Sequence, residues 1–70
     1  MDVGNIVMFK PEGTYAKWFG GQLGTVESAR YNKKGELYLR VRWMSPVKYH
    51  DKYASFSHFA ATNFVLFDNE

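Results

Sequence analysis

The sequence predicts an all-β fold, a small barrel of five short strands in which the sheet closes on itself. Residues 36–43 alternate apolar and polar side chains without a break, which is typical of a half-buried strand. The other apolar blocks are short, and no helical period extends beyond one turn. Five short strands in 70 residues cannot form two large sheets, and closure of one bent sheet removes its exposed edges.

We expect residues 1–70 to form one domain, because a chain of this length has room for only one core. Aromatic residues make up 19% of the chain and charged residues 23%, a composition that excludes a disordered protein. The absence of cysteine excludes disulfide-stapled folds and thiolate metal sites. No apolar run reaches the ~18 residues of a membrane span, and residues 1–5 do not resemble a signal peptide. We therefore expect a soluble protein of the cytoplasm, with no membrane partner.

The first predicted strand covers residues 6–9, an apolar block that ends at a turn containing Pro11 and Gly13. Residues 14–22 show neither a strand nor a helix period and are interpreted as a long aromatic loop.

A second strand is predicted over residues 23–31. Leu23 and Val26 are three apart, a spacing that a regular strand cannot place on one face, so Gly24 is expected to form a bulge or a sharp coil.

The third predicted strand, residues 36–43, follows a turn at residues 32–35 in which Gly35 can adopt the positive φ of a hairpin. Residues 44–55 are interpreted as a polar connection, because Pro46 and the tyrosines interrupt the pattern. Residues 56–59 and 64–67 are predicted to be the last two strands. The segment between them is too short for an α-helix and suits one 3₁₀ turn.

These strands predict a core drawn from all five of them. The block at residues 6–9 is apolar throughout, so its two possible phases are equally supported, and the phase with Ile6 and Met8 inward is adopted. The predicted core is then Ile6, Met8, Leu23, Val26, Leu37, Leu39, Val41, Trp43, Phe56, Phe59, Phe64 and Leu66.

Basic charge is concentrated in the middle of the chain. Residues 30–53 contain seven basic and two acidic residues, whereas both flanking segments are net acidic. Basic side chains interleaved with an aromatic residue suit a nucleic-acid backbone. The alternative is an ordinary solvated face in which Glu27 and Glu36 pair with the arginines across the hairpin. The candidate binding residues are Arg30, Lys33, Lys34, Tyr38, Arg40, Arg42 and Lys48.

A second candidate surface consists of aromatic residues in the loops, which could form a peptide groove or a cage for a cation. The alternative is that these residues cover an open end of the barrel and extend its core, in which case Trp18 is at least half buried. The aromatic candidates are Tyr15, Trp18, Tyr49 and Tyr53.

The order of four segments resembles a known family. Residues 4–7 (GNIV), 21–26 (GQLGTV), 39–43 (LRVRW) and 63–67 (NFVLF) resemble the SH3-like barrel in its KOW and Tudor-like versions. The chain departs from that pattern at Asn5, where Asp is common, and in its long loop after residue 10. Stand-alone barrels of this kind are similar to small proteins of tailed phages, some of which bind DNA. The resemblance implies a binding module, in the host cytoplasm if phage-encoded.

No motif predicts an enzyme, a metal site or a cofactor. The serines lie in no nucleophile elbow, there is no P-loop, and His50 and His58 have no metal-ligand spacing. We therefore expect a non-enzymatic module, a monomer or a weak dimer, that contacts the backbone of DNA or RNA through its basic hairpin. The alternative is a protein-interaction module that uses the aromatic loops.

Overall fold

The computed structural model describes residues 1–68 and is all-β, as predicted. Its elements are β1 (Ile6–Phe9), α1 (Ala16–Phe19), β2 (Leu23–Tyr31), β3 (Leu37–Tyr49), β4 (Lys52–Ala60), the 3₁₀ turn η1 (Ala61–Asn63) and β5 (Phe64–Asp68). The predicted 3₁₀ turn before the last strand is confirmed.

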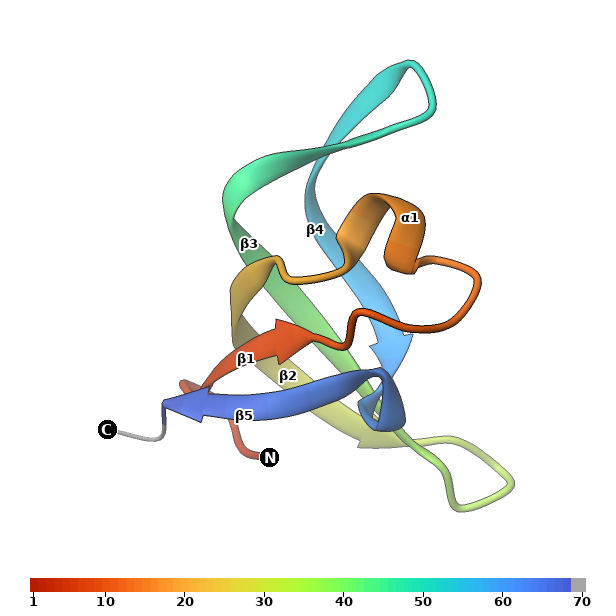
Figure 1. Ribbon diagram of the computed structural model, residues 1–70. Helices are drawn as coiled ribbons and strands as arrows, with labels where there is room; N and C mark the ends of the chain where they lie inside the picture. The colour runs from red at the N-terminus through yellow and green to blue at the C-terminus, as the bar shows by residue number, and fades with distance from the viewer. Residues whose placement is uncertain (69–70) are drawn as a thin grey trace.

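The five strands form one antiparallel sheet in the order β4-β3-β2-β1-β5. Figure 1 shows that this sheet is strongly bent, with β1 and β5 lying across the direction of β3 and β4. The predicted closure is not observed, because within residues 1–68 no pairing joins β4 to β5 and both remain edge strands. The bend nevertheless brings β1 and β4 together, since the rings of Phe9 and Phe59 lie 5.0 Å apart between centroids.

Phe9 is the centre of the core. It is 1% exposed, and its ring contacts those of Phe19 at 5.9 Å and Phe64 at 5.2 Å. Val7 is also buried, whereas Ile6 and Met8 are only partly buried, so the phase adopted for β1 from the sequence is wrong. An unbroken apolar block contains no alternation that could indicate which face is inward.

The alternation predicted for β3 is confirmed. Leu39, Val41 and Trp43 are buried, and Leu37 packs against them while partly exposed. The indole Nε1 of Trp43 donates a hydrogen bond to Ser57 Oγ at 3.1 Å, which satisfies its one polar group.

Besides Ile6 and Met8, three residues that were predicted to be in the core are not buried there. Phe56 is 41% exposed, because Phe59 faces the core and residues three apart on a regular strand point to opposite faces. Leu66 is exposed on the edge strand β5. Leu23 is only partly buried, because it pairs with Met8 on the face opposite Gly24 and Val26.

Gly24 is not the site of the bulge that was predicted for it. It pairs regularly with Val7 and Trp43, and the register of β2 shifts instead between Val26 and Ser28. A Cβ atom at Gly24 would collide with the side chain of Val41 and would lie 2.8 Å from the carbonyl oxygen of Arg42. Glycine is therefore needed here for close packing between β2 and β3.

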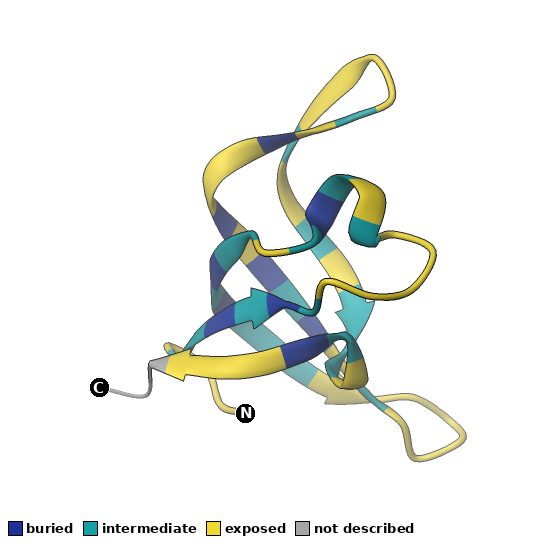
Figure 2. Ribbon diagram, in the orientation of Figure 1, coloured by how far each residue is buried: buried dark blue, intermediate teal, exposed yellow. Residues whose placement is uncertain are grey.

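Residues 44–55 form strands rather than the predicted connection. β3 and β4 continue together to a turn at His50 and Asp51, and this hairpin projects from the molecule (Figure 1). Pro46 lies where the register shifts between Arg42 and Val47, a place where the missing N–H of proline breaks no pairing. Figure 2 shows that the β2–β3 turn and the β3–β4 turn are largely exposed. The buried residues lie between these two turns.

The aromatic loop contains the short helix α1, which was not predicted. Phe19 of this helix is buried, and Trp18 is partly buried and packs against the core. Trp18 is thus at least half buried, as expected if the aromatic residues extend the core.

We predict that Phe9→Ala lowers the free energy of unfolding by about 3–5 kcal/mol, because it leaves a cavity among four other rings. The matched control is Phe67→Ala on β5, where the residue is 59% exposed and the expected change is within about 0.5 kcal/mol. Urea unfolding followed by circular dichroism measures both. Equal losses in the two variants would show that Phe9 is not the centre of the core.

Candidate functional site

The basic residues of the central hairpin lie on the face of β2, β3 and β4 that points away from the core. The strand register aligns them in three rows, each crossing from β2 through β3 to β4. We call this surface the outer face. Its rows are Thr25, Arg42 and Phe56; Ser28, Arg40 and His58; and Arg30, Tyr38 and Ala60.

A β-bulge adds a carboxylate to the outer face. Val26 pairs with Val41 and Ser28 with Arg40, so Glu27 is an extra residue in β2. Its carboxylate accepts hydrogen bonds from Nε of Arg40 at 3.0 Å and from Nε of Arg42 at 2.6 Å. One glutamate thus holds two arginines side by side.

These bonds lower the pKa of Glu27 below its ordinary value of 4.5, mainly through the hydrogen bond from Arg42 and then through that from Arg40. The carboxylate is therefore charged at neutral pH. The pairing of Glu27 that was considered from the sequence is confirmed. Glu36 instead accepts a hydrogen bond from Asn32 Nδ2 at 2.9 Å.

Arg40 has a second contact that orients it. The centre of its guanidinium lies 4.1 Å from the centroid of the Phe56 ring, a cation–π contact between neighbouring strands. An arginine has five N–H donors, so the bond from Nε to Glu27 leaves others available to a ligand.

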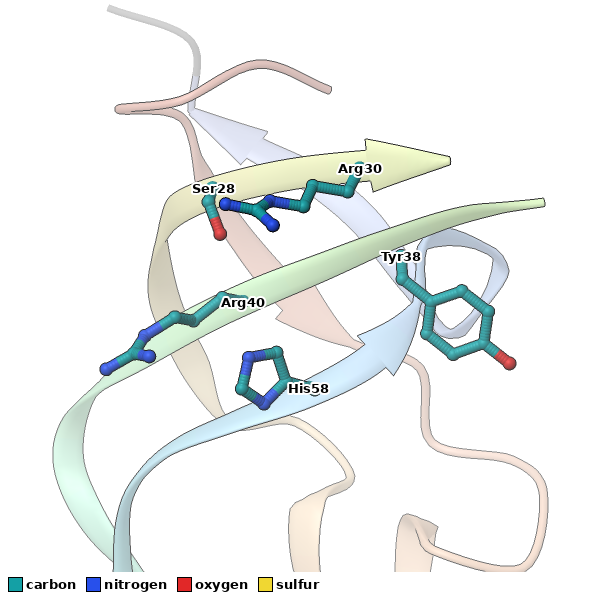
Figure 3. Close-up of a pocket in the computed structure, with 5 residues that line it drawn as sticks. All are labelled: Ser28, Arg30, Tyr38, Arg40 and His58. Carbon is teal, nitrogen blue, oxygen red and sulfur yellow. The ribbon is translucent and has the colours of Figure 1, made fainter. Parts of the chain in front are cut away.

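A hollow of about 380 Å³ opens on the outer face, and Figure 3 shows the side chains around it. Arg30 contributes its guanidinium from β2, and within residues 1–68 it takes part in neither of the two ion pairs. The residues that line the hollow are Ser28, Arg30, Tyr38, Arg40 and His58.

Lys33 and Lys34 lie at the exposed turn that extends beyond this face. The side chain of Asn32 organises the turn, since its Oδ1 accepts hydrogen bonds from the backbone N–H groups of Lys34 and Glu36, both at 2.9 Å. Gly35 has φ 81°, the positive value expected from the sequence. Lys48 is not part of this group, because it lies on the projecting hairpin at the other end of β3 (Figure 1).

The aromatic candidates come together only in part. Trp18 contacts Tyr49 at 4.9 Å and Tyr15 at 6.4 Å between ring centroids. Tyr49 also contacts the ring of buried Phe19, and Tyr15 contacts that of partly buried Phe59. Tyr53 pairs with Lys48 and is 69% exposed, away from these rings. A hollow of about 370 Å³ lies beside Tyr15 and Tyr49.

Sequence reasoning missed two residues of the outer face, Phe56 and His58. A strict alternation through residues 56–59 places both on one side and Ser57 and Phe59 on the other, which would have located them. The assignment of Phe56 and Phe59 to one core concealed that pattern.

Within residues 1–68, no helix is long and apolar enough to cross a membrane. No group of three or more histidine, cysteine or acidic side chains in the described part of the chain could hold a metal ion.

We predict that the contribution of Glu27 to stability depends on pH. Because its folded pKa is lowered, the stabilisation is present above the unfolded value of about 4.5 and is lost as the pH falls through the folded value. Glu27→Gln should therefore melt below the wild type at neutral pH, and the difference should shrink in acid. A difference in Tm that stays the same at both pH values would contradict the charge-based origin.

Comparison with known proteins adds no family assignment: no family model, no curated protein and no solved structure matches this chain.

Proposed function

We propose that the protein is a non-enzymatic binding module that contacts the backbone of DNA or RNA through its outer face and the adjoining lysine turn. The observation that carries the proposal is the alignment of Arg30, Arg40 and Arg42 on one exposed face, two of them held by Glu27. Arginine binds phosphate through planar, bidentate contacts, and holding the side chain in place reduces the entropy lost on binding.

The spacing of these side chains supports a backbone contact. Arg40 and Arg42 are two residues apart on one strand, so they repeat at roughly 6.6–7 Å, close to the separation of neighbouring phosphates. Lys33 and Lys34 continue the positive charge past the end of the sheet.

The same proposal includes the fold family suggested by the sequence. Five antiparallel strands with a 3₁₀ turn before the last are compatible with an SH3-like barrel of the KOW or Tudor-like type. Here the sheet is open between β4 and β5.

The test is a double charge reversal, Arg40→Glu with Arg42→Glu, in a fluorescence-anisotropy titration of mixed DNA and RNA oligonucleotides at about 50 mM salt. We expect affinity to fall at least about tenfold, because phosphate contacts are replaced by repulsion. Lys17→Ala on α1 is a control that removes one positive charge from outside the outer face. Circular dichroism establishes that each variant is folded.

The proposal also predicts how steeply the binding affinity falls as the salt concentration rises. If Arg30, Lys33, Lys34, Arg40 and Arg42 each meet a phosphate, the logarithm of affinity should fall with the logarithm of salt with a slope of roughly 3–5. Absence of binding to both nucleic acids at low salt, or unchanged binding by the double variant, contradicts the proposal.

We further predict that Glu27→Gln strengthens nucleic-acid binding, because it removes the negative charge that competes with phosphates, while the amide oxygen of glutamine still accepts an N–H bond that orients an arginine. Removing one negative charge should raise affinity several-fold at low salt, and the gain should disappear at high salt. The same anisotropy titration measures it. Weaker binding by this variant would mean that Glu27 acts mainly by orienting the arginines.

A protein-interaction module is the second candidate function. The observation that favours it is the hollow beside Tyr15, Tyr49 and Phe59, which has aromatic walls and an exposed tyrosine at its edge. Such a site would bind with little salt dependence and would lose affinity on Tyr15→Ala. The double variant Arg40→Glu with Arg42→Glu would not affect it, because neither arginine lines this hollow.

A further inference from the structure

We propose that the outer face binds single-stranded rather than duplex nucleic acid, with an unpaired base stacked on Tyr38 or His58 and a neighbouring phosphate on Arg30. This inference rests on the proposed function and specifies its ligand. Single-stranded DNA and single-stranded RNA both provide the required ligand, a flexible strand whose bases are accessible.

Two aromatic rings lie exposed among the arginines. Tyr38 is 41% exposed and is two residues before Arg40 on β3, while His58 is the direct partner of Arg40 on β4. Both rings are seen nearly face-on in Figure 3, on the same side of the sheet as Arg30 and Arg40. Their faces are thus available to a planar group that approaches from solvent.

The hollow between these residues suits one nucleotide unit. It measures about 380 Å³, and its lining combines two rings, two guanidinium groups and the hydroxyl of Ser28. Rings can stack with a base, guanidinium groups can bind a phosphate, and a hydroxyl can donate or accept a hydrogen bond.

Arg40 extends the stacking surface. Its guanidinium is held over the Phe56 ring at 4.1 Å and is bonded to Glu27 through Nε. Bases stack on guanidinium planes as well as on aromatic rings. Arg40 on β3 therefore adds a planar group beside Phe56 and His58 on β4.

The charge balance disfavours a duplex. Glu27 offsets one of the three arginine charges on the outer face, so these four residues together carry a net charge of +2. A duplex hides the faces of its bases in its own stack, so it could use this charge and the adjoining lysine turn but would leave Tyr38 and His58 without a contact. A single strand can use both the charge and the rings.

The experiment compares four labelled probes of about 12 nucleotides by fluorescence anisotropy at one salt concentration. They are a mixed-sequence DNA strand, the RNA strand of the same sequence, the DNA duplex, and an abasic strand with the same phosphates. We expect the better-bound single strand to bind at least about fivefold more tightly than the duplex or the abasic strand. The ratio of the affinities for the DNA strand and the RNA strand then shows which of the two nucleic acids the protein prefers.

Matched variants separate stacking from charge. At least one of Tyr38→Ala and His58→Ala should weaken single-strand binding by about 5- to 100-fold, with abasic binding and the salt slope unchanged. Tyr38→Phe keeps the ring and should bind normally. The control is Tyr31→Ala, which removes an exposed tyrosine from the opposite face of the same hairpin.

The outcomes distinguish this inference from the proposed function. The stacking model is wrong if duplex, abasic and single-stranded probes bind with equal affinity, or if both alanine variants bind the single strand normally. Neither result contradicts binding to the nucleic-acid backbone. Failure of every probe to bind at low salt overturns both. Folded variants are identified by their thermal midpoints before the titrations.

Discussion

The structure depends on the burial of one aromatic ring, that of Phe9. Its ring contacts aromatic rings from α1, β3, β4 and β5, so a side chain on a four-residue strand joins most of the molecule. A domain of this size buries a smaller fraction of its surface than a larger domain does, about 60%, and large aromatic rings bury the most apolar area per residue. The bend of the sheet follows from this need, because only a bent sheet brings β1 opposite β4.

The same bent sheet produces the outer face. While one side of β2, β3 and β4 encloses the rings, the other side presents arginines in register with Tyr38 and His58. The bulge at Glu27 connects the two sides, because it keeps Val26 in the core while it turns an additional carboxylate toward Arg40 and Arg42. This register shift thus affects both the burial of Val26 and the pairing of the two arginines.

Strand positions could be predicted where local pattern and turn chemistry agree. The alternation from Leu37 to Trp43 and the turn ending at Gly35 are correct, since each depends on neighbouring residues alone. Strand prediction failed where neighbouring residues do not alternate between apolar and polar. The apolar block of β1 allowed either phase. The tyrosines around Pro46 concealed the continuation of β3 and β4, which depends on cross-strand pairs such as Val47 with Ala54 rather than on a regular apolar pattern.

The sequence by itself determined the all-β class, the buried face of β3 and the concentration of basic charge in the central hairpin, because period and composition are local properties. Only the tertiary structure decided that Phe9 points inward, that the sheet stays open, and that Phe56 and His58 join the arginines. It also separated Lys48 and Tyr53 from the other candidates. These features depend on cross-strand register, which is selected by the packing of the whole core.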